Sequence, residues 1–199
     1  MSNDQQRDAL ERCIERHQQW LDSERTNGER LDLRAAGLAE IDWSDAHLCE
    51  VDLREANMEG ARLAGADLYG SLLAGARLDR ASLDGANLAK SNLDEASLID
   101  TSLRGAKLVR ATFSGADLRR ADLTGADLLK VFLANADLRG AILAGNLERV
   151  SLTGTRLAGA RLTGATGLES AIVEWIDIGQ DEPQRLEGEA ARAWLRART

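Results

Sequence analysis

The chain is poor in aromatic residues, proline and cysteine, and it has no long apolar run. Aromatic residues make up 4% of its 199 residues, and there is a single proline. No run of about 18 apolar residues occurs, so no membrane partner is expected. Two cysteines, Cys13 and Cys49, are too few for a disulfide framework. Free thiols therefore predict a reducing compartment, the cytoplasm, and the polar start, which lacks the apolar stretch of a signal peptide, agrees with this.

An excess of positive charge is also missing. The chain has 33 acidic and 25 basic residues, a net charge of −8. Because a sequence-independent nucleic-acid binder needs a cationic surface for phosphates, direct binding of nucleic acid is not expected. The charge is uneven: residues 31–100 hold 14 acidic and 6 basic groups, and residues 101–164 hold 5 and 10. This polarity is explained either by solvation or by two contact zones of opposite charge.

What the sequence does contain is a repeat of five residues. An apolar residue recurs at every fifth position from Leu33 to Leu143, and the spacing resumes at Leu147 and continues to Leu162. These 27 units have Leu at the centre in 24 cases, a small residue two positions earlier, and Gly two positions later in 13. One unit is a residue short, and we expect a bulge or kink there that Gly145 absorbs.

This period fits neither a helix nor a flat strand. Five residues advance a helix by a net turn of about 140°, so the leucines would spiral around all its sides. A strand alternates with a period of two, which an odd spacing breaks. If the five side chains of a unit point in, out, in, out and out, the unit forms a short extended piece followed by a turn. Repetition winds the chain into stacked coils about 4.8 Å apart, and the Asp and Asn residues before each centre should hydrogen-bond the turn backbone.

Units such as Ala116-Asp117-Leu118-Arg119-Arg120 and Ala121-Asp122-Leu123-Thr124-Gly125 resemble the pentapeptide repeat family. The resemblance implies an all-β solenoid, a right-handed quadrilateral β-helix with one pentapeptide per side. Residues 31–164 would then form roughly seven coils in a rod about 32 Å long. Axial leucines would form its core, each contributing roughly 2 kcal/mol on burial.

The two ends of the chain differ from the repeat and predict caps for the open ends of the solenoid. In residues 1–30, an amphipathic helix is expected over 3–26, with Ser2 and Gln5 as a capping box and Gly28 as its stop. Its apolar side would carry Leu10, Cys13, Ile14, His17, Trp20 and Leu21.

In residues 165–199, a strand is expected over 171–178 and a helix from Asp181-Glu182-Pro183 to about Arg196. This end either caps the solenoid or dimerises, since the resemblance implies a homodimer through it. The expected dimer-interface residues are Ile172, Trp175, Ile178, Leu186 and Trp194.

No motif in the sequence indicates catalysis. There is no phosphate-binding glycine loop, no His-Glu-x-x-His and no serine-nucleophile motif. His47 and Cys49 lie two residues apart, which is weak support for a metal site. A filled axis leaves no concavity in which polar groups converge. The sequence therefore predicts no enzyme, no cofactor and no metal.

Function is then expected on the outside of the rod. Assigning every fourth unit to one side places Leu72, Phe132, Asp94 and Glu95 together, up to the short unit. Another side carries Lys90, Lys107, Arg110 and Lys130, near Tyr69, Val109 and Leu129. The candidate partner contacts are Asp52, Glu55, Glu59, Asp94, Glu95 and Phe132.

Two hypotheses follow for the function. The first is a non-catalytic protein-interaction or scaffold module whose protein partner is unknown. The second follows from the resemblance, because some members of the family mimic DNA and bind DNA gyrase or topoisomerase IV, giving drug resistance or toxin immunity. The acidic early coils favour the second hypothesis. The net basic late coils and the lack of inserted loops count against it.

Overall fold

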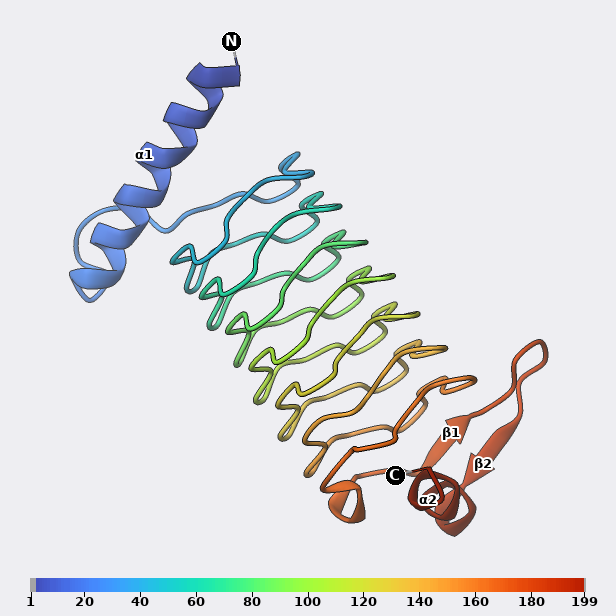
Figure 1. Ribbon diagram of the computed structural model, residues 1–199. Helices are drawn as coiled ribbons and strands as arrows, with labels where there is room; N and C mark the ends of the chain where they lie inside the picture. Colours follow the sequence, from blue (N-terminus) through green and yellow to red (C-terminus); the bar gives the residue numbers. More distant parts are fainter. Residues whose placement is uncertain (1–2, 199) are drawn as a thin grey trace.

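The computed structural model describes residues 3–198, with side chains from residue 12 onward. Helix α1 (Asn3–Asp22) comes first, and the 3-10 helix η1 (Leu168–Ser170) follows the repeats. Strands β1 (Trp175–Asp177) and β2 (Arg185–Glu187) and helix α2 (Gly188–Arg196) then complete the chain. Between α1 and η1 the chain winds as a solenoid of stacked coils (Figure 1). The predicted solenoid is confirmed.

Each coil has four sides, and parallel bridges join equivalent residues of successive coils, for example Ser97 to Asp117. We name the four columns of outward-facing bridge residues faces A, B, C and D. Face A holds Asp32, Asp52, Leu72, Asn92, Thr112, Phe132, Ser151 and Ile172. Face B holds Gly37, Asn57, Arg77, Ser97, Asp117, Asp137, Arg156 and Asp177. Face C holds Asp42, Arg62, Ser82, Ser102, Asp122, Ile142 and Arg161. Face D holds His47, Asp67, Asn87, Lys107, Asp127, Asn146 and Thr166. The right-handed sense of the coil stays a prediction.

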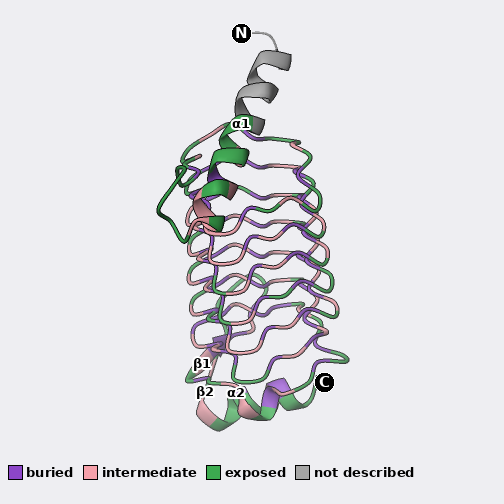
Figure 2. Ribbon diagram, turned by 90° about the vertical axis from the view of Figure 1, so that its left-hand side faces the viewer, coloured by how far each residue is buried: buried purple, intermediate pink, exposed green. Residues whose placement is uncertain are grey.

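The repeat centres fill the axis of the solenoid. From Leu48 to Leu162 every central side chain is at most 1% exposed. Small inward residues lie between them. The hydroxyl of Ser91 donates to the Leu68 carbonyl of the preceding coil at 2.7 Å, and Ser71 and Thr101 bond in the same way. Figure 2 shows buried segments repeating along every coil. The axis is therefore closed to solvent and to ligands.

Outward Asp and Asn residues close the turns, as the sequence predicts. A side-chain oxygen accepts the backbone N–H two residues later, from Tyr69 to Asp67 at 3.2 Å and from Thr124 to Asp122 at 2.9 Å. At Ser97 and Ser102 an Asp of the preceding coil substitutes: Asp79 accepts from the Ile99 N–H at 2.9 Å and Asp84 from the Arg104 N–H at 3.1 Å. The regular recurrence of Asp is thus explained by turn formation.

The short unit leaves the stacking intact. Bridge partners are 20 residues apart up to Asp122 and Ile142, and 19 apart at Asp127 and Asn146. The four faces continue beyond the short unit. The assignment of every fourth repeat unit to one side, which was expected to hold only up to the short unit, therefore also holds after it. Gly145 is buried there, and a Cβ at this position would overlap the carbonyl oxygen of Ala126. The coil also continues past residue 164, because bridges persist as far as Asp177 and η1 inserts the extra residues of the last coil.

The N-terminal helix ends at Asp22, four residues earlier than expected, and Gly28 lies in the turn beyond it. The proposed capping box of Ser2 and Gln5, and the side chain of Leu10, lie outside the described residues and side chains. Helix α1 lies against the side of the first coils (Figures 1 and 2). The first coil stays partly open, since Leu33, Ala36 and Ile41 are half-buried. The predicted N-terminal cap is therefore partial.

His17 anchors this partial cap. Its side chain is 0% exposed and stacks on Trp20 with ring centroids 5.6 Å apart. The Leu31 N–H donates to Nδ1 at 3.0 Å, so Nε2 carries the proton and donates to the Cys49 carbonyl at 2.7 Å. Burial, helped by the nearby Arg30, lowers the pKa of His17 below its usual 6.5 against the opposing influence of Glu50.

The C-terminal cap differs from the expectation. The sequence predicts a helix that begins at Asp181, but this segment forms a turn and then β2. Strand β2 pairs antiparallel with β1, with Trp175 opposite Glu187 and Asp177 opposite Arg185. The pairing leaves only residues 188–196 for α2. Asp177 explains the change, because its side chain accepts the N–H groups of Gly179 at 3.0 Å and Gln184 at 2.7 Å and so fixes a hairpin. Helix α2 buries Ala191 and Leu195 against the last coil.

Gly145→Ala should destabilise the solenoid by about 3 kcal/mol, because the added methyl must displace backbone of the neighbouring coil. The midpoint of urea unfolding measures this. Gly37→Ala is the matched control, since Gly37 also lacks a positive φ but has open space around it. That variant should change stability by less than about 0.5 kcal/mol. Equal stabilities of the two variants would contradict the close approach at Gly145.

Docking of α1 should weaken as the pH falls below 6.5. The folded protein holds fewer protons on His17 than the unfolded chain does, because the folded pKa is lower, so stability is present above 6.5 and is lost on acidification. An NMR titration of the His17 ring, with the Leu31 amide as second reporter, measures this. His17→Gln should remove the pH dependence. A folded pKa at or above 6.5 would contradict the prediction.

Candidate interaction surfaces

The filled axis leaves only the exterior for binding. A shallow cavity of about 600 Å³ lies beside the first coils, lined by Asp32, Arg34, Arg54 and Glu55. Three of these four groups are paired: Arg34 lies 2.6 Å from Asp32 and lowers the pKa of that carboxyl to about 2, and Arg54 pairs with Asp52. A carboxylate held ionised by a guanidinium is a poor general acid or base. The cavity therefore offers charge pairs and no poised catalytic group.

The histidine and cysteine pair does not form a metal site. His47 is exposed on face D, while the half-buried Cys49 has its pKa raised to about 12 by burial and by Asp67. Across the described side chains, no group of three or more His, Cys, Asp or Glu could hold a metal ion. Within residues 3–198, no helix has the length and apolar character to cross a membrane.

The acidic residues predicted as partner contacts divide into two groups. Asp52 is 6% exposed and pairs with Arg54 at 2.6 Å, and Glu59 pairs with Arg77 at 3.0 Å and also with Arg80. These two carboxylates are already neutralised within the chain.

The other three carboxylates lie at turns between faces A and B. Asp94 accepts the Ser114 N–H at 2.8 Å. In the described part of the chain, Glu55, Asp94 and Glu95 form no ion pair. Only this second group offers free negative charge to a partner.

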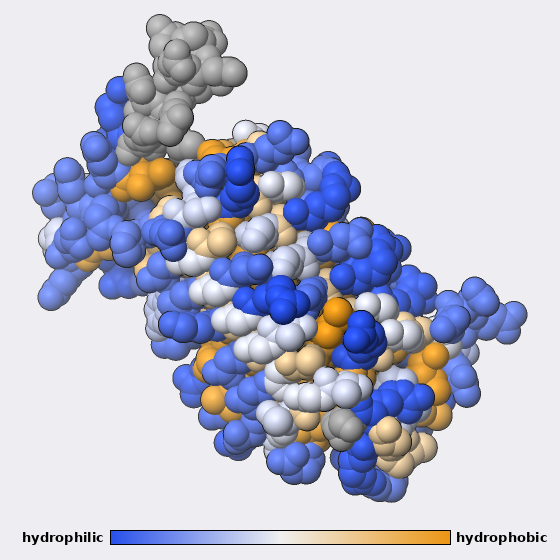
Figure 3. Space-filling view, viewed as in Figure 1, coloured by the Kyte–Doolittle hydropathy of each residue, from blue (hydrophilic) through white to orange (hydrophobic). Residues whose placement is uncertain are grey.

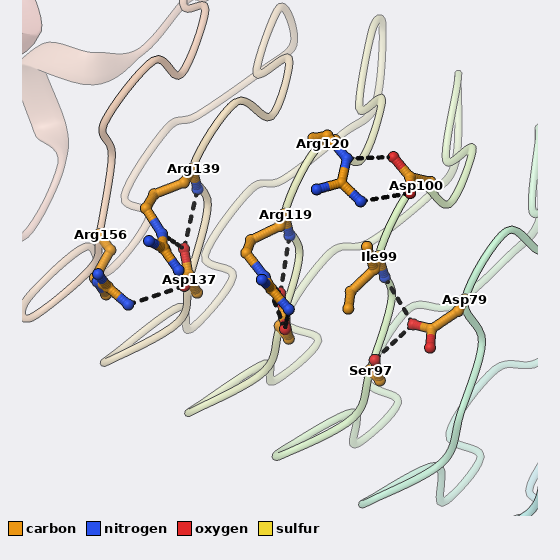
Figure 4. A network of polar contacts seen from close by, with 10 residues as sticks. Asp79, Ser97, Ile99, Asp100, Arg119, Arg120, Asp137, Arg139 and Arg156 are labelled. Atoms are coloured by element: carbon orange, nitrogen blue, oxygen red, sulfur yellow. Dashed lines mark hydrogen bonds and ion pairs between the residues drawn. The ribbon is translucent and has the colours of Figure 1, made fainter. Parts of the chain in front are cut away.

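Face B neutralises its own charges along the late coils. Arg119 lies 2.7 Å from Asp117, and Arg139 lies 2.6 Å from Asp137. Arg156 bridges Asp137 at 3.2 Å and Asp177 at 3.5 Å, which ties the last coils to β1. Figure 4 shows Arg139 and Arg156 both turned toward Asp137. Face B is thus an internally satisfied ladder of charges.

The turns between faces D and A have the opposite character. We name the column formed by Lys90, Arg110, Lys130 and Arg149 the cationic edge. Backbone bonds stack it, since the N–H of Arg110 donates to Leu129 O at 3.0 Å and that of Lys130 to Glu148 O at 2.9 Å. Among the described ion pairs none involves these four side chains, although Lys90 lies 5.1 Å from the Tyr69 ring centroid. The five-residue count predicts the grouping of the first three but does not reach Arg149, which follows the short unit.

Large apolar side chains are exposed at two points of face A. Phe132 is 50% and Ile172 is 57% exposed, in alternate coils of one column. The hydroxyl of Thr112, the bridge neighbour of Phe132, is the one buried polar atom among the described side chains that has no hydrogen-bond partner. On the side shown in Figure 3, apolar groups are scattered among hydrophilic ones.

The residues predicted for a dimer interface are mostly used inside the chain. Ile178, Leu186 and Trp194 pack against the core, and Arg185 lies 4.4 Å from the Trp175 ring centroid. Of the five, Ile172 alone is exposed. Dimerisation through this end stays a prediction, with Ile172 as its remaining apolar contact.

Comparison with known structures and families agrees with this architecture. The cyanobacterial pentapeptide repeat protein HetL of Nostoc sp. strain PCC 7120, involved in the regulation of heterocyst differentiation, is 29% identical with a TM-score of 0.52, covering 77% of this chain and 78% of HetL. QnrB1, a plasmid-mediated fluoroquinolone resistance protein, shares the fold at 18% identity with a TM-score of 0.58, covering 75% of this chain and 82% of its own. No curated protein matches the sequence.

The family model for pentapeptide repeats matches eight copies, in overlapping segments at residues 31–70, 61–98, 91–131, 116–145 and 133–166. These segments cover the whole stack of coils up to η1. The chain belongs to the pentapeptide repeat family.

Proposed function

We propose that this protein is a non-catalytic binding module that engages a protein partner through the late coils of face A. The exposure of Phe132 carries the proposal. Its neighbours along the column, Thr112 and Ser151, are small and leave its ring standing out from the rod. An aromatic ring is the side chain that most often anchors a protein interface. A cytoplasmic location remains part of this proposal.

Three further features support a binding role. The axis is filled, so no substrate enters it. The Asp residues that recur along the chain are used to close turns or to pair with arginine. The family match and the likeness to HetL support a non-catalytic repeat protein at the level of the family.

Photo-crosslinking tests the proposal directly. Phe132→p-benzoylphenylalanine, expressed in cells of the source organism, should give one discrete adduct on illumination. Ile142→p-benzoylphenylalanine is the matched control, because Ile142 is also an apolar bridge residue of the late coils but lies on face C. An adduct of twice the chain mass would identify a second copy as the partner. No adduct at Phe132, or equal adducts at both positions, would contradict the proposal.

A second candidate function is DNA mimicry toward gyrase or topoisomerase IV, with drug resistance or toxin immunity as the outcome. The free carboxylates of Glu55, Asp94 and Glu95 favour it, because a phosphate mimic needs negative charge that is not already paired. The net charge of −8 agrees. The pairing of Asp52 and Glu59 and the presence of the cationic edge count against it, so we place it second.

A supercoiling assay with titrated protein, with and without a fluoroquinolone, tests the second candidate. Inhibition of supercoiling or protection from the drug is expected if it is correct, and Glu55→Gln with Glu95→Gln should weaken that effect about threefold or more. The pair Asp32→Asn with Asp52→Asn removes two carboxylates that are already paired and serves as the control. No effect at micromolar protein would exclude this candidate.

A further inference from the structure

The cationic edge is made of residues at a turn position that other edges also fill with charged residues, such as Glu55, Arg80 and Glu95. All four residues occupy the turn position with a left-handed backbone: φ is 60° at Lys90, 61° at Arg110, 58° at Lys130 and 56° at Arg149. Side chains with a Cβ are strained in this conformation, and glycine is not. The edge between faces C and D shows the relaxed alternative, with Gly105 and Gly125 at the same position. The fold therefore accepts glycine at these positions and does not require a cation there.

Internal charge pairing does not explain them either. At the same turn position between faces B and C, Arg80 pairs with Glu59 and Arg120 with Asp100 at 2.6 Å. On the cationic edge, no described carboxylate lies within ion-pair distance of any of the four cations. The nearby Asp127 is engaged in its own turn, where it accepts from Leu129 N–H at 3.2 Å and from the Asn146 side chain at 2.9 Å. The four cations are left for a group outside the chain.

Apolar side chains accompany the cations. Val109 and Leu129 directly precede Arg110 and Lys130 and are partly exposed, and Phe132 lies two residues after Lys130. Apolar side chains thus lie beside the two central cations of a column about 14 Å long for four stacked coils, while Lys90 follows Ala89 and Arg149 follows Glu148. Such a column matches a single chain that carries both carboxylates and apolar groups.

We propose that the cationic edge binds an extended acidic segment of a protein partner, lying along the rod with carboxylates toward the four cations and apolar side chains toward Val109, Leu129 and Phe132. This rests on the proposed function and names the chemistry of the partner. Acidic residues two apart in an extended peptide are about 6.8 Å from each other, and long flexible Lys and Arg side chains bridge the difference from the coil spacing.

The width and surroundings of the edge favour a peptide over nucleic acid or a membrane surface. Duplex DNA and anionic bilayers are broader than one column of side chains. They would also meet the remaining surface of a chain whose net charge is −8. A polyanion without apolar groups would leave Val109, Leu129 and Phe132 unused.

Fluorescence anisotropy at low salt tests the inference on the full chain. The probe is a labelled twelve-residue peptide of repeated Glu-Leu-Glu-Gly, and the same peptide with Gln for Glu is the control ligand. The wild-type chain should bind the Glu peptide, with affinity that falls as salt rises, and should bind the Gln peptide at least about tenfold more weakly. A single-stranded oligothymidylate and phosphatidylserine vesicles form the two competing arms.

Glycine substitutions provide matched variants, because glycine is unstrained at these turn positions and so should preserve the fold, as circular dichroism would verify. Arg110→Gly with Lys130→Gly should weaken peptide binding about fivefold to tenfold. Arg80→Gly with Arg120→Gly removes the same charge from the same backbone position on another edge, where φ is 59° at both residues. The affinity of that control variant for the Glu peptide should stay within about twofold of the wild-type value.

Three results would overturn the inference: no binding of the Glu peptide, equal losses in the two glycine pairs, or tighter binding of the oligothymidylate or the vesicles. Failure here is distinguishable from failure of the proposed function. An adduct at position 132 that persists when Arg110 and Lys130 are both replaced by glycine would leave the binding module standing and remove only the acidic segment.

Discussion

The hydrogen bonding of each coil to the next is the constraint on which this structure depends. On every side, a central residue donates its N–H to the coil that follows, as Leu98 does to Asp117 at 2.7 Å, and the bridge residue donates to the coil that precedes, as Asp117 does to Ala96 at 2.9 Å. These bonds hold the coils close enough for leucines to fill the axis without gaps. Buried backbone groups must be paired, so the five-residue rhythm tolerates a missing residue only where Gly145 lets two backbones approach.

This constraint separates stability from recognition. Inward positions hold small residues and, at the centres, leucine in 24 of 27 units, while outward positions are free to vary as long as the turns close. The same scaffold therefore carries a ladder of neutralised charges on face B and a column of unpaired cations between faces D and A. A partner would meet a rigid array of side chains at the coil spacing, with little ordering required of the rod itself.

The candidate site was only partly predictable from the sequence. Phe132 and the basic group of Lys90, Arg110 and Lys130 emerge from counting every fourth unit, since the fold is periodic. Counting cannot show that Glu59 is neutralised, because its partners Arg77 and Arg80 reach it from the next coil. The partner of Asp52 is Arg54 of the same turn, and only the side-chain geometry shows that the two meet. Counting also missed Arg149, because the short unit shifts the numbering by one, and it could not show that Trp194 and Leu186 pack inward against the last coil.

The sequence by itself determined the solenoid, its core residues and the role of the recurring Asp, because these follow from local periodicity that repeats at every unit. The structure of the two ends, where the sequence has no repeat, was decided by tertiary contacts alone. Asp177 stabilises a hairpin in the segment around Pro183, where the sequence predicts the start of a helix. At the other end, His17 binds α1 to the side of the first coil. Tertiary structure also decided which charges are free. Pairing between coils joins residues about 20 apart in the chain, and whether their side chains meet is settled by distance in space, which periodicity does not specify.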